Sequence, residues 1–286
     1  MDTVPYLFCD AVAGTIAEIL EISRQLTAAN HPQFISWKTS LDHHSSNRQI
    51  FQFFIAVRRG NWSYSIYKSA KSICFAELKQ LKTTYLQNCH VSFCSNPEIH
   101  SSNRQEIEEI LKYTSPLVNL ATVFLHNEEM AEDDFSVMLS YFKNVQFSTI
   151  KIGHYRKCFE IFLKCQLQTR YVEGLNICGR HWSTEIGDQL KALMLKGEID
   201  GVDCLNTNLV FDKTFVETLF EIRHLKYDLT LSAVCSFSPE ELRELWTHIQ
   251  EGFGDQLIWN REDGVTITAD ECGERTWRIT MSVAVN

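Results

Sequence analysis

Seven short apolar segments recur along this chain at intervals of about 27 residues, and this spacing constrains the fold more than any other feature. Most of them carry two apolar residues separated by one residue, as in Val91/Phe93 and Leu229/Leu231, which is the alternation typical of a β-strand. The predicted strands are His90–Cys94, Leu120–His126, Ser148–Gly153, Val172–Cys178, Ile199–Leu205, Tyr227–Ala233 and Gln256–Asn260.

Segments with helical periodicity separate these strands. Two of them begin at Ser183 and Ser238, where a hydroxyl precedes acidic first-turn residues, as helix capping favours. The predicted helices are Asn103–Tyr113, Asp133–Phe142, Arg156–Leu167, Ser183–Leu195, Asp212–Leu225 and Ser238–Gln250. Strands and helices alternating at this period predict a leucine-rich-repeat-like α/β solenoid with a mostly parallel sheet. An ordinary α/β sheet with crossovers of equal length is the alternative.

The N-terminal part of the chain has a different pattern. Apolar residues at helical spacing predict a helix over residues 4–27, and a second, short helix is predicted over residues 33–41. Two β-rich segments, Ile50–Arg58 and Trp62–Lys68, flank Gly60-Asn61, which is typical of a hairpin. The pattern therefore predicts a small helix-plus-hairpin N-terminal module ahead of the repeats.

The C-terminal end also departs from the repeat. Val265–Thr268 and Trp277–Val285 alternate like strands and are predicted to form an antiparallel hairpin that caps the sheet edge. The domain prediction is an N-terminal module at residues 1–84 and a repeat domain at residues 85–286 that includes this capping hairpin.

Charge and hydropathy exclude several classes of partner. The formal net charge is −9, and adjacent basic pairs occur only at Arg58-Arg59 and Arg156-Lys157. Because nucleic-acid binding depends on clustered Lys and Arg, we expect no nucleic-acid partner. The first residues lack a signal peptide's basic region, and no apolar stretch approaches the ~20 residues that span a bilayer. We expect a cytoplasmic or nuclear protein with no membrane partner.

No motif indicates catalysis or a cofactor. The ten cysteines contain no Cys-x-x-Cys pair, so we expect buried structural thiols in a reducing compartment. Asp42-His43-His44 resembles one motif of metal-dependent phosphoesterases, but the further Asp and His motifs of such a cluster are missing. Phosphate-binding glycine loops and serine nucleophile elbows are also missing. We predict no catalytic residue, no metal and no cofactor; a metal-dependent hydrolase is the rival class.

Protein recognition is the function that the pattern favours. In a solenoid, the residues that directly follow each strand line one rim of the sheet. Exposed Arg, His and aromatic residues there would form a binding hot spot. The predicted protein-binding residues of this rim are Arg180, His181, Trp182, Asn206, Asn208 and Phe237. For Trp182, the alternative is that the indole anchors its own repeat.

The N-terminal sequence contains several distinctive stretches: a start of the form Met-Asp-x-Val-Pro-x-x-Phe, Val4–Ile16 (VPYLFCDAVAGTI), Trp37, the stretch LDHHSSNR at residues 41–48 and the strand IFQFFIAV. Together these stretches resemble a family expanded in nematodes. The layout is similar to that of nematode F-box proteins, in which a short helical module precedes a leucine-rich-like region.

This resemblance implies a substrate-recognition adaptor of a cullin-type ubiquitin ligase. It implies that Val4, Pro5 and Phe8 bind the linker subunit of the ligase. Two alternatives stay open: the same apolar residues pack as core, or the chain is a stand-alone binding factor such as an inhibitor, an immunity protein or a toxin–antidote component.

Overall fold

The computed structural model describes residues 35–83, 86–95, 100–169, 172–222, 228–237, 241, 250–251, 257–260, 265–273 and 276–283. The chain divides into two compact units. Unit 1 comprises Met1–Ala121, Asn127–Met130 and Ser140–Gln146, and unit 2 comprises Thr122–His126, Ala131–Leu139 and Phe147–Asn286. The predicted helices at residues 4–27 and Ser238–Gln250 lie wholly or mostly outside the described residues.

Unit 1 contains the predicted hairpin. Strands β1 (Gln49–Arg58) and β2 (Asn61–Lys68) pair antiparallel, and Arg58 pairs directly with Asn61. The turn residues are therefore Arg59 and Gly60, with φ of 50° and 79°, and not Gly60-Asn61 as predicted. Positive φ at both central positions is the geometry that matches strand twist in a two-residue hairpin.

Other elements of unit 1 extend this hairpin into a mixed sheet. Strand β1 pairs in parallel with β4 (Leu86–Cys94), and β2 pairs antiparallel with β3 (Lys71–Ile73) and β5 (His100–Ser102). The predicted N-terminal module and the first predicted repeat strand thus lie in the same unit. The remaining elements are α3 (Ile35–Asn47), α4 (Phe75–Lys79), α5 (Arg104–Thr114) and the 3-10 helix η3 (Ser115–Leu117).

Helix α5 illustrates how the sequence fixes these elements. The side chain of Asn103 accepts a hydrogen bond from the amide of Glu106 at 2.9 Å, which caps the helix N-terminus. Ile107, Ile110 and Leu111 follow at helical spacing and are fully buried. The prediction for this segment, Asn103–Tyr113, is confirmed to within one residue.

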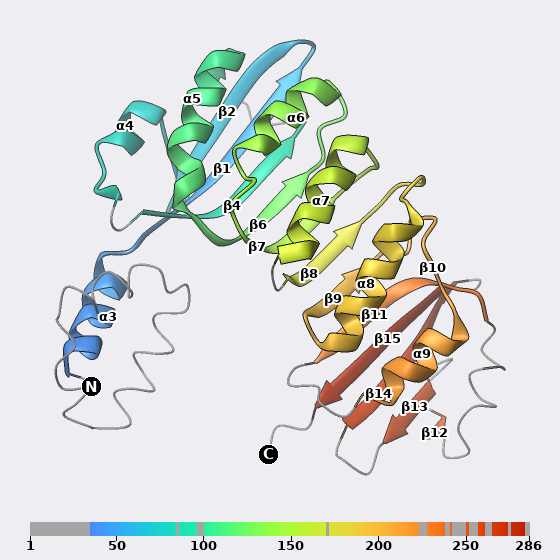
Figure 1. The fold of residues 1–286 in the computed structure, drawn as a ribbon. Helices are drawn as coiled ribbons and strands as arrows, with labels where there is room; N and C mark the ends of the chain where they lie inside the picture. The colour runs from blue at the N-terminus through green and yellow to red at the C-terminus, as the bar shows by residue number, and fades with distance from the viewer. Residues whose placement is uncertain are drawn as a thin grey trace. The chain divides into compact units, whose positions relative to one another are not determined.

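Unit 2 contains the parallel strands that the repeat predicted (Figure 1). In order across the sheet they are β7 (Phe147–Ile152), β8 (Val172–Ile177), β9 (Ile199–Asp203) and β11 (Leu229–Cys235). Leu175 pairs with Val202, and Val202 pairs with Leu231, so the predicted neighbour order of these three strands is confirmed. The short strand β10 (Val210–Phe211) also pairs in parallel with β11.

Helices connect these strands. The connecting helices are α7 (Lys157–Thr169), α8 (Thr184–Lys196) and α9 (Lys213–Phe220), which lie on one face of the strands (Figure 1), and α6 (Glu132–Ser140) precedes β7. Strand β6 (Val118–Leu125) contributes residues to both units. Helix α8 ends at Gly197, whose φ of 66° permits a Schellman motif in which the amide of Glu198 donates to the carbonyl of Leu193 at 2.9 Å.

The C-terminal strands correct one part of the prediction. Strands β14 (Val265–Gly273) and β15 (Thr276–Val283) form the predicted antiparallel hairpin, and β15 pairs antiparallel with β11. Strand β13 (Leu257–Asn260), which was predicted to follow β11 in the parallel series, instead pairs antiparallel with β14; the two-residue strand β12 (Gln250–Glu251) pairs with β13. The reason lies in β15, where Trp277, Ile279 and Met281 form a fully buried face that continues the core beside β11.

The fold is therefore mixed α/β, with a run of parallel strands in unit 2 and antiparallel strands beyond it. The coarse fold class is confirmed, whereas a solenoid is not shown, because βα units of equal length also build an ordinary open α/β sheet. Within the residues described, no helix is both long and apolar enough to cross a bilayer.

Candidate protein-binding site at the ends of strands β8 and β9

The segment that follows β8, residues 178–183, is here called the rim loop. Trp182 is the fifth of its six residues and is only 2% exposed. Its indole Nε1 donates a hydrogen bond to the carbonyl of Cys178 at 3.2 Å, and its ring packs edge-on against Tyr155, with 5.2 Å between centroids. Trp182 therefore takes the alternative role stated for it above: the indole anchors the loop and offers no ring surface to a partner.

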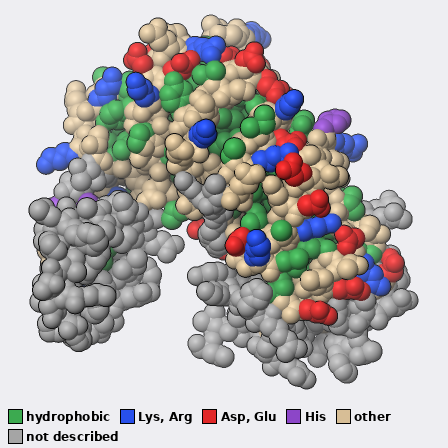
Figure 2. Space-filling model, viewed as in Figure 1, with side chains coloured by type: hydrophobic (Ala, Val, Ile, Leu, Met, Phe, Trp, Pro, Cys, Tyr) green, Lys and Arg blue, Asp and Glu red, His purple; other side chains and the backbone are tan. Residues whose placement is uncertain are grey.

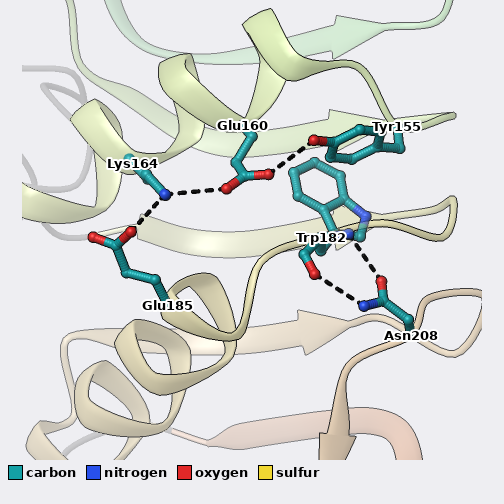
Figure 3. Close-up of polar contacts among 6 residues, drawn as sticks. All are labelled: Tyr155, Glu160, Lys164, Trp182, Glu185 and Asn208. Atoms are coloured by element: carbon teal, nitrogen blue, oxygen red, sulfur yellow. Dashed lines mark hydrogen bonds and ion pairs between the residues drawn. The ribbon is translucent and has the colours of Figure 1, made fainter.

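Asn208, in the loop that follows β9, holds the rim loop from the neighbouring strand (Figure 3). Its Oδ1 accepts hydrogen bonds from the amides of His181 and Trp182, each at 2.9 Å. Its Nδ2 donates to the carbonyl of Trp182, also at 2.9 Å. One amide side chain thus pairs three backbone groups that are not part of any helix or strand ladder.

The backbone of the rim loop adopts an uncommon conformation. Gly179 has φ of 96°, and a Cβ added there would lie 2.4 Å from the amide nitrogen of Tyr155, so this position requires glycine. His181 has φ of 103°, which is rare for a residue with a side chain and costs of order 1–3 kcal/mol. Because the Asn208 hydrogen bonds flank His181, they are what hold it there. Strained backbone conformations of this kind cluster at functional sites.

The predicted rim residues separate into two groups. Arg180, His181, Asn206 and Asn208 are exposed, in the positions that the pattern indicated. Trp182 and Phe237 are buried, at 2% and 3% exposed, because both rings fill the apolar interior at the strand ends. The remaining predicted binding residues, Val4, Pro5 and Phe8, lie outside the described residues.

A chain of polar contacts supports the rim loop from the helix side (Figure 3). The hydroxyl of Tyr155 donates to Glu160 at 3.1 Å, Lys164 lies 3.1 Å from Glu160, and Lys164 lies 2.6 Å from Glu185. Burial alone would raise the pKa of Glu160, but side-chain hydrogen bonds, including those from Lys164 and Tyr155, lower it below its ordinary value. The ring that packs on Trp182 is thus held by an ionised carboxylate.

The distribution of charge gives no sign of a nucleic-acid surface on the visible face. Over the described helices in Figure 2, Lys and Arg side chains are interspersed with Asp and Glu. Several form pairs, including Arg104 with Glu108 and Lys191 with Asp212. Pairing of this kind neutralises the basic side chains that phosphate contacts would need.

The candidate metal triplet lies on helix α3. Asp42 lies 3.6 Å from Lys38, His43 is exposed, and His44 is 2% exposed with its ring edge-on to that of His43. Across the part of the chain that the structure describes, no group of three or more His, Cys, Asp or Glu side chains is arranged to hold a metal ion.

The cysteines occupy several environments. Cys158, Cys204 and Cys235 are buried free thiols, as expected for structural cysteines. Burial raises the pKa of Cys158 to about 11 and that of Cys235 to about 12, so neither is a thiolate at neutral pH. Cys165 is exposed, contrary to the expectation of burial, because it faces outward from α7.

The contacts that hold the rim loop were not predicted from the sequence. Asn208 was predicted as a contact residue, and its hydrogen bonds to the backbone were not foreseen; Tyr155 was not singled out at all. A usable signal was the glycine directly after a predicted strand, because Gly179 indicates a backbone that turns sharply against a neighbour. Comparison of the chain with known protein families, curated proteins and solved structures gave no match.

Proposed function

We propose that this chain is a non-enzymatic protein that binds another protein through the exposed side chains of the rim loop. The observation that carries the proposal is the Asn208 clamp, which fixes His181 at positive φ and leaves Arg180 and His181 exposed. A loop ordered before binding loses little conformational entropy on association, so more of the contact energy appears as affinity. Arginine is among the residues enriched at binding hot spots.

The more specific proposal is a substrate-recognition adaptor of a cullin-type ubiquitin ligase. It is supported by the resemblance of about residues 1–70 to the nematode family and by the order of its parts, an N-terminal module ahead of α/β units. In this proposal Val4, Pro5 and Phe8 bind the linker subunit, and the rim loop binds the target. The rival, a stand-alone binding factor, shares the rim loop and lacks the linker contact.

Site-specific photo-crosslinking tests the rim loop. A benzoylphenylalanine at position 180 should give a discrete cross-linked species in cells, and the same probe at Glu173 should not. Glu173 is exposed on β8, the strand that precedes the rim loop, which makes it a matched control. Adding Asn208→Ala should weaken the cross-link, since the loop is then no longer held. Identical products from both probe positions would contradict the proposal.

Binding to the ligase linker subunit tests the N-terminal part. If the apolar residues near the N-terminus bind the linker, Phe8→Ala should abolish co-precipitation with the purified linker and leave Tm nearly unchanged. If they are core, the same substitution should cost about 3–5 kcal/mol of stability. A stable variant that still binds the linker contradicts both versions. A wild-type chain that cross-links a target without binding the linker supports the stand-alone factor.

A further inference from the structure

A cavity of about 570 Å³ lies in unit 1 between helices α4 and α5. Its volume falls within the range of ~300–1,000 Å³ that small-molecule sites occupy. Phe75 and Lys79 of α4 line one side, Glu106 and Glu109 of α5 line the other, and Tyr64 of β2 lies between them. None of these residues belongs to the rim loop or to the residues proposed to bind the linker subunit, so the cavity is a separate site.

The two sides of the cavity carry opposite charges. The Nζ of Lys79 lies 4.0 Å from the centroid of the Phe75 ring, which is a cation–π contact. Glu106 accepts a hydrogen bond from the hydroxyl of Ser102 at 2.8 Å, and Glu109 is exposed. Among the residues that the structure describes, neither carboxylate pairs with a cation and Lys79 pairs with no carboxylate. The cavity therefore separates an ammonium group from two carboxylates that do not neutralise it.

Tyr64 supplies a polar group on the cavity wall in addition to the charged side chains. Its side chain is only 4% exposed, and its hydroxyl accepts a hydrogen bond from the amide of Phe75 at 3.3 Å. Within the described residues nothing accepts the hydrogen of that hydroxyl. Burial raises the pKa of Tyr64, so the group stays a neutral donor at physiological pH. Because the hydroxyl faces the open cavity, water or a ligand oxygen can accept its hydrogen there.

We propose that this cavity binds a small zwitterion carrying both an ammonium and a carboxylate group, the chemical class of free amino acids and short peptides. The ligand's carboxylate pairs with Lys79 and accepts the hydrogen of Tyr64. Its ammonium group pairs with Glu106 and Glu109. The Phe75 ring is only 7% exposed, so the charged groups and not this ring set the class of ligand.

Three closely related probes separate the charges of the ligand. L-phenylalanine carries both charges, L-phenylalaninamide carries only the ammonium, and N-acetyl-L-phenylalanine carries only the carboxylate. Titration of the full chain by calorimetry or by NMR should give saturable binding of L-phenylalanine. Each single-charge probe should bind about 1.5- to fivefold more weakly, the loss expected for one partly exposed charged contact.

Two variants should then give crossed losses. Lys79→Gln should weaken binding of L-phenylalanine and of the N-acetyl probe, and leave the amide probe unchanged. Glu109→Gln should weaken binding of L-phenylalanine and of the amide probe, and leave the N-acetyl probe unchanged. Lys82→Gln and Glu173→Gln are matched controls, because both residues are exposed and neither lines the cavity.

Three results overturn the proposal. They are an absence of saturation by L-phenylalanine up to about 10 mM, equal affinity for the three probes, and variant losses that do not cross in this way. The rim-loop cross-link is a separate measurement, so its failure leaves this outcome unaffected, and the reverse also holds.

Discussion

Asn208→Ala is the substitution that most directly tests whether the rim loop is held as the structure describes. The change removes one exposed side chain and leaves the backbone of the β9 loop in place. It deletes the acceptor of the His181 and Trp182 amides and the donor to the Trp182 carbonyl. No apolar surface is lost, so any effect reports the hydrogen bonds and the strained backbone that they hold.

The magnitude follows from the three hydrogen bonds. Each is 2.9 Å long, and a bond of this kind contributes about 0.5–1.5 kcal/mol net. Without these hydrogen bonds, His181 is free to relax from its φ of 103°. The strain energy that this releases partly offsets the loss of stability. We therefore expect the free energy of unfolding of unit 2 to fall by about 2–3 kcal/mol, which corresponds to a fall in Tm of roughly 4–10 °C for a protein of this size.

Hydrogen exchange locates the effect. The amides of His181 and Trp182 should exchange about 30- to 100-fold faster in Asn208→Ala, while amides in strand β7 change only as much as global stability does. Asn208→Asp keeps the acceptor and loses the donor, so its loss should be intermediate. Asn206→Ala is the control, because the backbone carbonyl of Asn206 still accepts the Gly179 amide. If Asn208→Ala and Asn206→Ala are equally stable, and the two amides exchange as in wild type, the reasoning fails.

Three further predictions concern other groups. In the native protein, iodoacetamide should modify Cys165 well before Cys204 and Cys235, because burial raises the pKa of both buried thiols; equal rates by mass spectrometry would contradict this. Glu160 has a folded-state pKa below its ordinary 4.5, so its ionisation stabilises the fold above that pH and the benefit is lost as pH falls through the lower value; Glu160→Gln should therefore be less stable than wild type at pH 7, and urea titrations should show the difference narrowing as the pH is lowered below 4.5. Elemental analysis should find no stoichiometric zinc, iron or manganese, whereas about one metal per chain that is lost in His43→Ala would support the hydrolase.

The longer strands and most of the described helices were predictable because burial imposes a period on the sequence, whereas the two- and three-residue strands β3, β5, β10 and β12 were not predicted. Leu175, Val202 and Leu231 are fully or almost fully buried on adjacent strands, and each sits in an apolar alternation that only a strand satisfies. The position of β13 was not predictable in the same way. Its alternation is as strandlike as that of β11, and nothing local records that β14 and β15 lie between them.

The hairpin turn shows a smaller error with a local cause. Asn61 is a common turn residue, and its place after Gly60 favoured a turn made of those two residues. The register of β1 with β2 is fixed instead by burial, since Phe51, Phe53 and Ile55 must share one face. Arg59 then takes positive φ, because the register leaves it no other position in the turn.

The polar contacts of unit 2 follow the same period as the strands, although the apolar pattern did not reveal them. The hydrogen bond from the amide of His181 to Asn208 spans 27 residues, as does that from Asn176 to Asp203. The ion pairs of Lys164 with Glu185 and of Lys191 with Asp212 both span 21 residues, and they join equivalent places on successive helices.

These pairs arise because neighbouring βα units place equivalent positions side by side. A polar residue one period after another therefore has a geometric reason to contact it, just as an apolar one does. Hydrophobic periodicity cannot rank such pairs, since a solvated lysine and a paired lysine look alike in sequence. Asn208 differs from the other polar pairs because its partner, the rim loop, contains Gly179 and His181 at positive φ. Backbone groups in this conformation cannot pair in a regular strand ladder, so the Asn208 side chain pairs them instead. At Asn208, residues one period apart therefore form a polar contact that holds a surface loop in one conformation, instead of an apolar contact within the core.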